Sequence, residues 1–150
     1  AVDAAAANAT PPVYELSEFL VDRLEVTDVG AYFPAIVAFH PTCHSQRMLG
    51  IGDRPQRLLA AVEGIRVAPL AHPLECCGFG GTFSVKNPDT SVAMGNDKVD
   101  DVLATGADVL VSADTSCLMH IGGLLSRRGA GRSGTPVRVM HLAEVLAATR

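Results

Sequence analysis

The sequence lacks the short motifs that mark most nucleotide-dependent and hydrolytic enzymes. It contains no phosphate-binding P-loop and no Ser-His-Asp signature. Gly-x-Gly-x-x-Gly occurs once, at residues 129–134, but there it follows an expected helix, whereas the dinucleotide-binding motif follows a strand and opens a helix. Gly50-Ile51-Gly52 lacks the third glycine and the strand that should precede it. We therefore expect neither nucleotide binding nor a self-contained acid–base catalyst.

Long runs of one residue type are also missing. There is no basic run, and the net charge is -4 with a pI near 5.7, so a nucleic-acid partner is not expected. Arg127, Arg128 and Arg132 form the densest basic cluster, which we interpret as a solvated loop. No apolar run approaches the roughly 20 residues of a membrane span. No positive charge precedes Arg23, which is unlike a secretory signal.

Cysteine is scarce, with four residues among 150, whereas 48% of the residues are apolar. This length and apolar content suit one domain with a real core. Secreted disulfide scaffolds are usually small and poor in core residues, unlike this chain. A reduced, cytoplasmic protein is therefore expected.

Short apolar strands alternate with segments of helical periodicity. The expected strands are residues 36–39, 65–70, 109–111 and 137–140, and the expected helices lie near 16–24, 55–63, 92–105, 118–128 and 142–146. Each strand is apolar on both faces, which is typical of a parallel sheet covered by helices. The predicted fold class is α/β with a short parallel sheet.

The cysteines occupy corresponding places in this pattern. Cys43, the pair Cys76-Cys77, and Cys117 each follow an expected strand, with 32 and 39 residues between successive positions. Ligands bind at the C-terminal edge of the strands in open α/β sheets. We therefore expect the three cysteine loops to converge at that edge.

Four thiolates can complete a site for zinc or for iron and sulfide. The doublet runs into Gly78, Gly80 and Gly81, which let the backbone approach a bound group and aim N–H donors at sulfur. Helices beginning at Cys43 and Cys117 should lower thiol pKa values and favour metal binding.

Histidines near the cysteines are further candidates. His120 lies three residues after Cys117, so the two share a helix face, and His120 is a candidate ligand. His44 adjoins Cys43 and is a candidate for supporting a ligand. His141, which also follows an expected strand, is a weaker site candidate. The other polar residues are interpreted as structural or solvated: the side chains of His40 and His72, the helix caps Asp114 and Ser116, and the surface charges Lys86 and Lys98.

An internal echo points to a duplication. Residues 16–20, Leu-Ser-Glu-Phe-Leu, match residues 142–146, Leu-Ala-Glu-Val-Leu, at an offset of 126. The echo predicts that residues 13–24 are the last helix of a preceding copy, and it aligns Glu15 with His141. We expect residues 1–12 to be a disordered or truncated lead-in, and residues 13–150 to be one domain, the second half of a duplicated protein.

Three stretches together resemble the cysteine-rich CCG domain, which occurs twice in a subunit of heterodisulfide reductase and in related iron–sulfur subunits of glycolate and lactate oxidation. The stretches are His40-Pro41-Thr42-Cys43-His44, Glu75-Cys76-Cys77-Gly78-Phe79-Gly80-Gly81-Thr82-Phe83 and Asp114-Thr115-Ser116-Cys117-Leu118-Met119-His120. They look most like the lactate-utilization members of the family. The fuller family pattern ends in Cys-x-x-Cys, whereas this chain has His120 at the last position.

The resemblance implies an electron-transfer domain of an L-lactate oxidising complex, with a [4Fe-4S] cluster held by Cys43, Cys76, Cys77, Cys117 and His120. Because His120 replaces a cysteine, either it substitutes as a ligand or the site holds an ordinary cluster or another metal. A structural zinc domain for subunit assembly is the alternative, and thiol redox chemistry at Cys76-Cys77 is a third possibility. The implied partners are the other subunits of the complex and a missing N-terminal CCG domain, without which exposed apolar surface favours self-association.

Overall fold

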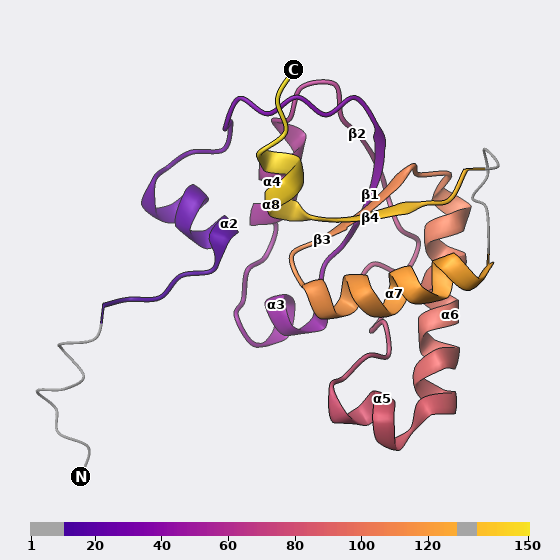
Figure 1. Ribbon diagram of the computed structural model, residues 1–150. Coiled ribbons are helices and arrows are strands. Elements are labelled where there is room, and N and C mark those ends of the chain that lie inside the picture. Colours follow the sequence, from indigo (N-terminus) through magenta and orange to yellow (C-terminus); the bar gives the residue numbers. More distant parts are fainter. Residues whose placement is uncertain (1–10, 129–134) are drawn as a thin grey trace, which may run out of the picture.

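The computed structural model describes residues 11–128 and 135–150 and contains a four-stranded parallel sheet in the order β2-β1-β3-β4 (Figure 1). The strands are β1 (Ile36–His40), β2 (Arg66–Ala68), β3 (Val109–Ser112) and β4 (Arg138–His141). The predicted α/β fold with a short parallel sheet is confirmed. Residues 1–10 of the predicted lead-in, and Arg132 of the predicted basic loop, lie outside the described residues.

Helices cover both faces of the sheet (Figure 1). Those on one face are α4 (Arg54–Ala60) and α8 (Leu142–Leu146), and those on the other are α6 (Pro88–Thr105) and α7 (Thr115–Arg128). The short helices α3 (Cys43–Arg47) and α5 (Thr82–Lys86) lie at the C-terminal edge of the strands, and α2 (Leu16–Glu18) continues into the π-helical turn η1 (Phe19–Arg23). The sequence pattern did not predict α5, which is a single short turn after three closely spaced glycines.

Only the two central strands are buried on both faces. All of β3 and four of the five residues of β1 are buried, and their side chains alternate between the two cores. Val67 of β2 is 43% exposed and Val139 of β4 is 37% exposed. The expectation that every strand is covered on both faces is therefore wrong for the edge strands, each of which begins with an exposed arginine, Arg66 in β2 and Arg138 in β4.

The connections after β1 and β3 leave on opposite faces of the sheet. β1 leads through α3 to α4 on one face, whereas β3 leads directly into α7 on the other. The two strands are neighbours, with His40 paired in register with Ser112. Adjacent strands whose helices diverge in this way leave a crevice at their carboxyl ends, where α/β proteins bind ligands.

The loop between β2 and Cys76 is fastened to α6 by a buried ion pair. Asp101 accepts hydrogen bonds from the N–H groups of Ala71 (2.7 Å) and His72 (3.1 Å). Lys98 Nζ lies 3.5 Å from the Asp101 carboxylate and also donates to the His72 carbonyl. The side chain of Lys98 is only 1% exposed. The sequence-based interpretation of Lys98 as a surface charge is wrong, because its ammonium is buried and contacts the Asp101 carboxylate and the His72 carbonyl.

Replacing Lys98 with methionine should lower the free energy of unfolding by about 3 kcal/mol, because it leaves the buried Asp101 carboxylate with two backbone N–H donors but no opposite charge. Urea denaturation of the metal-free, reduced protein measures this change. Lys86→Met is the matched control. Lys86 is exposed, so its replacement should change the free energy by no more than about 0.5 kcal/mol. Equal stabilities for the two variants would contradict the role given to the Lys98–Asp101 pair.

Candidate metal centre

The crevice at the ends of β1 and β3 receives cysteines from three directions. Cys43 is the first residue of α3, whose start is capped by the Thr42 hydroxyl, 3.1 Å from the Ser45 N–H. Cys117 lies in the first turn of α7, where the Asp114 carboxylate accepts from the Ser116 N–H at 2.8 Å. The predicted capping role of Asp114 is confirmed. Both cysteines thus lie at helix starts, as the sequence indicated.

Three buried side chains meet at the centre of the crevice. The candidate ligand atoms of His40, Cys77 and Cys117, one from each residue, all lie within 4.8 Å of one another. The three residues are 1%, 2% and 6% exposed. His40 was interpreted from the sequence as structural or solvated, and it is not solvated. Both ring nitrogens are buried and neither makes a hydrogen bond of normal geometry, although the ring lies close enough to Cys77 to lower the pKa of that thiol. The structure therefore adds His40 to the group of candidate ligands.

The two buried thiols, Cys77 and Cys117, shift each other's pKa in opposite directions. A hydrogen bond from the Cys117 thiol holds the pKa of Cys77 well below its ordinary value, against the opposing effect of burial, and His40 and the Phe79 N–H lower it further. The same contact with Cys77, together with burial and the nearby Asp114 charge, raises the pKa of Cys117. The expectation that the helix start lowers the pKa of Cys117 is therefore wrong, because these neighbours outweigh the helix terminus. Of the two thiols, Cys77 is thus the one whose ionised form its surroundings favour.

Cys43 and Cys76 complete the cluster of thiols on its more open side. Both are half-buried. Burial raises the pKa of Cys76, the Gly78 N–H opposes this from 3.4 Å, and the charges of Cys43 and Cys77 raise it again. The Cys43 thiolate, through its charge, also raises the pKa of Cys117. The four thiols therefore form one electrostatic unit, and the predicted convergence of the three loops is confirmed.

Gly78 fits the cysteine loop against α6. Its φ is +86°, and a Cβ built on it would lie 2.5 Å from the Ser91 carbonyl oxygen and 2.8 Å from the Met94 Cβ. Both the left-handed backbone and the lack of space require glycine at this position. The Gly78 N–H meanwhile points at the Cys76 sulfur, as expected for a glycine-rich loop beside a thiolate.

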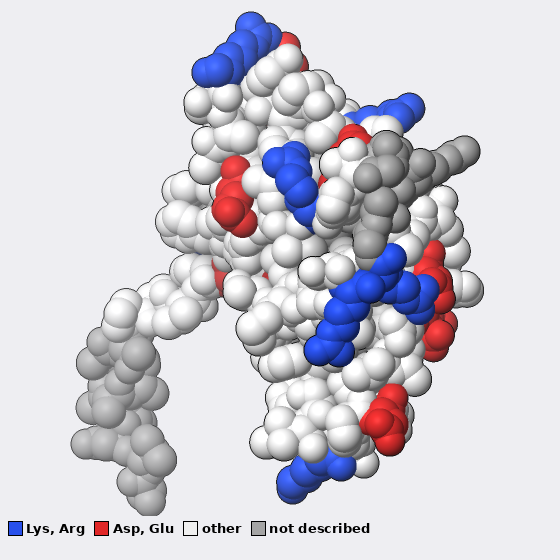
Figure 2. Space-filling view, turned by 45° about the vertical axis from the view of Figure 1, so that its right-hand side comes forward, with Lys and Arg blue, Asp and Glu red and all other residues white. Residues whose placement is uncertain are grey.

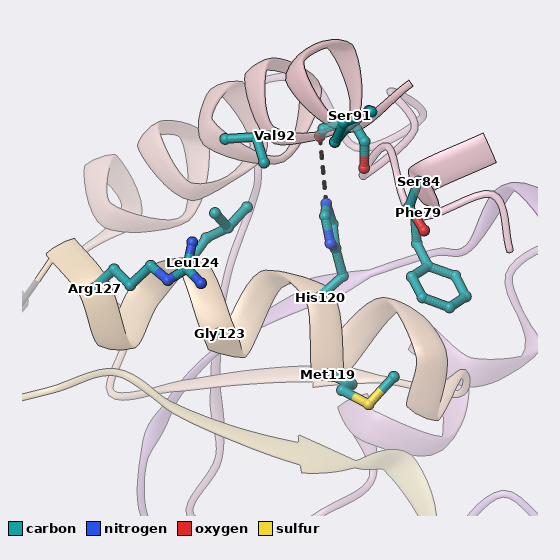
Figure 3. A pocket seen from close by; sticks show the side chains of 10 residues that line it. Phe79, Ser84, Ser91, Val92, Met119, His120, Gly123, Leu124 and Arg127 are labelled. Carbon is teal, nitrogen blue, oxygen red and sulfur yellow. Dashed lines mark hydrogen bonds between the residues drawn. The ribbon is translucent and has the colours of Figure 1, made fainter. Parts of the chain in front are cut away.

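His120 lies in a pocket beside the thiols rather than among the mutually close atoms. The pocket, of about 350 Å³, is lined by α6, α7 and the loop before α5, and the His120 ring points from α7 toward α6 (Figure 3). Its Nε2 is 3.3 Å from the Ser91 carbonyl oxygen, and its ring centroid is 6.1 Å from that of Phe79. The role of His120 as a ligand stays a prediction.

The other histidines lie away from the centre. His44 is exposed on α3, and His72 is exposed with its Nδ1 3.8 Å from the Glu75 carboxylate. His141 caps α8, because its Nδ1 accepts from the Ala143 N–H at 3.2 Å. The echo aligned His141 with Glu15, and Glu15 caps α2 in the same way, with a capping-box glutamate three residues later in both helices.

Charged side chains are dispersed over the face of the molecule shown in Figure 2. Basic and acidic side chains form separate small groups on the face shown in Figure 2, with broad uncharged areas between them. Among the described residues, no helix is both long enough and apolar enough to cross a membrane.

Comparison with known families matches residues 37–122 to the family CCG, described as a cysteine-rich domain. The matched span covers more than half of the chain and includes all four cysteines, His40 and His120. The chain belongs to the cysteine-rich domain family. The resemblance drawn from the three motifs is thus confirmed.

Similar proteins carry one recurring name. This cysteine-rich domain is 56% identical over 133 residues to "Lactate utilization protein A" of Exiguobacterium sp. (strain ATCC BAA-1283 / AT1b), covering 89% of this chain and 52% of the relative. It is 50% identical to proteins of that name from Bacillus cereus (strain B4264) and, as "Lactate utilization protein A 2", Bacillus mycoides (strain KBAB4), covering 89% of this chain and 54% of each relative. The chain spans about half the length of the curated relatives it matches.

Substituting Gly78 with alanine should destabilise the protein by several kcal/mol, because the new methyl group would overlap the α6 backbone. Gly30→Ala is the matched control. Its φ of +73° is also positive, but nothing lies within 4 Å of a Cβ there, so only a conformational penalty of about 1–2 kcal/mol is expected. Thermal unfolding of both variants in the metal-free state measures the difference. Similar losses in the two variants would show that close packing at Gly78 is unimportant.

Proposed function

We propose that this domain holds an iron–sulfur cluster and passes electrons within a larger oxidoreductase. The observation that carries the proposal is the gathering of four thiols, two of which, Cys77 and Cys117, lie beside the buried imidazole of His40. Buried polar groups normally have hydrogen-bond partners. A buried imidazole that has none and lies beside a thiolate is therefore suited to binding a metal. Thiolate sulfur and imidazole nitrogen are ligands that iron and zinc both accept.

The proposed ligands are Cys43, Cys76, Cys77 and Cys117, and His120 stays a prediction as a fifth. A bound cluster would supply one-electron chemistry, with a potential set by its ligands, hydrogen bonds and burial. The chain's own part is to present sulfur from three loops, to aim the Gly78 N–H at Cys76, and to keep Cys77 and Cys117 out of water. Such tasks need no proton-transfer residues, consistent with the absence of an acid–base motif.

The relatives' name supports a substrate class for the whole protein. Since those proteins are named for lactate utilization, we place this domain in a cytoplasmic complex that oxidises L-lactate or a similar 2-hydroxy acid together with other subunits. The domain would be the electron carrier of that complex. Growth of a deletion strain on lactate as sole carbon source, with and without the full-length gene, tests this placement.

Replacing Cys43 or Cys117 with alanine should abolish cluster assembly, because the loss of one thiolate leaves an open metal position that solvent can attack. The measurement is iron, acid-labile sulfide and visible absorption after anaerobic reconstitution. His72→Ala is the control, since this exposed side chain pairs with Glu75 on the surface, away from the thiols. Full iron and sulfide in either cysteine variant would contradict the ligand assignment.

A structural zinc site is the second candidate, and the spacing of the buried group favours it. Ligands of a tetrahedral zinc ion with bonds of about 2.3 Å stand about 3.8 Å apart. The ligand atoms of His40, Cys77 and Cys117, all within 4.8 Å of one another, suit a single ion of this kind. Stoichiometric, colourless zinc in protein purified without oxygen would favour this candidate over the cluster.

We further propose that this domain is the second of two similar halves. In α8 the echo positions Leu142 and Val145 are fully buried, whereas Leu16 and Phe19, their equivalents at the α2–η1 segment, are 37% and 41% exposed. The same apolar pattern is thus buried in α8 and partly exposed to solvent in the α2–η1 segment. A preceding domain, packed on α2 as this domain's sheet packs on α8, would bury it.

The chain on its own should therefore self-associate through the α2–η1 segment, because exposed Phe19 and Leu24 gain from burial. Sedimentation velocity across a concentration series measures this. The double variant Phe19→Glu with Leu24→Glu should be monomeric, whereas Val85→Glu, at an exposed apolar position on α5, should behave like the unmodified chain. A monomer at every concentration would refute the prediction.

A further inference from the structure

We infer that His40 is the nitrogen ligand of the metal centre, a role that rests on the proposed metal-binding function. No motif in the sequence assigns it, and the sequence pattern directed attention to His120 instead. The ligands would then be three or four thiolates together with one neutral imidazole, and the imidazole comes from the end of β1.

The first support is the environment of the ring. His40 is 1% exposed, and neither Nδ1 nor Nε2 has a hydrogen-bond partner. A buried polar group without a partner costs roughly 1–3 kcal/mol, so an apolar residue at this position would stabilise the metal-free fold better. The imidazole is therefore poorly suited to a purely structural role and well suited to binding an electrophile between it and the thiols.

The second support is that the backbone fixes the direction of the side chain. His40 is the last residue of β1 and follows Ala38 on the strand face that meets α6 and α7. The Ser112 hydroxyl donates to the His40 carbonyl at 2.9 Å, which holds the strand end in register with β3. Cys77 and Cys117 belong to the core on that same face. The ring is thus directed at the two buried thiols by rigid elements.

The third support is the contrast with His120. Its Nε2 already has the Ser91 carbonyl oxygen at 3.3 Å, and its ring is half-buried in a pocket lined by α6 and α7. The same nitrogen lies against α6, since a Cβ built on Gly95 of that helix would be 2.8 Å from it. His120 is a satisfied side chain that packs behind the centre, whereas His40 is an unsatisfied one that faces it.

The test uses protein labelled with ¹⁵N only in histidine. It is loaded without oxygen either with iron and sulfide and then reduced, or with Co²⁺, so that either type of centre becomes paramagnetic. Pulsed electron paramagnetic resonance then detects a histidine nitrogen bonded to the metal. The wild type should show this coupling, His120→Ala should keep it, and His40→Ala should lose it together with at least about tenfold in Co²⁺ affinity.

His40→Cys guards against a variant that fails to fold, because it offers a thiolate in place of the imidazole. It should bind Co²⁺ and show no nitrogen coupling, and circular dichroism confirms folding of each variant. Exposed His72 provides the control His72→Ala, which should match the wild type.

Coupling that survives in His40→Ala and disappears in His120→Ala would overturn the inference and return the role to His120. A wild type that loads metal without any histidine coupling would also overturn it, while leaving the proposed function intact. A wild type that loads neither iron and sulfide nor Co²⁺ would overturn both.

Discussion

The close approach of α6 to the cysteine loop and to α7 is the constraint on which the site depends. Two positions without side chains permit it: Gly78 in the loop and Gly95 on the helix. A Cβ at Gly95 would lie 2.3 Å from Leu124 and 3.2 Å from the Cys77 carbonyl oxygen. With larger residues at either point, Cys77 would move away from Cys117. The glycine after the cysteine pair is therefore a packing requirement as well as a turn.

That proximity sets the electrostatics of the metal-free centre. Cys77 and Cys117 are too close and too buried for both to ionise, so a low pKa at Cys77 implies a raised one at Cys117. A cation between them would remove this conflict by stabilising both thiolates, and its binding would release the Cys117 proton. A neutral imidazole such as His40 adds a donor to such a centre without adding a further negative charge.

Local pattern was enough to predict the sheet and the meeting of the three cysteine loops, because strand–helix alternation fixes which loops share an edge. It failed for His40 and Lys98. A lone histidine and a helical lysine are usually structural or exposed, and only strand alternation from Ala38 indicates that His40 faces the cysteines. Nothing in the sequence shows that Lys98 turns inward, because its partners, Asp101 and the backbone near His72, are set by tertiary packing.

The way the loops are held bears on the choice between a redox and a structural centre. The approach to Cys76 is already fastened by Lys98 and Asp101, and the start of α7 by the Asp114 cap. Two apolar cores cover the central strands. A zinc ion whose task is to hold loops together would add little to such a framework, unlike in small domains that have no core. Meanwhile Cys43 and Cys76 leave one side of the centre half-open, where a redox partner can approach. A preformed site with one accessible side therefore supports electron transfer over a purely structural role.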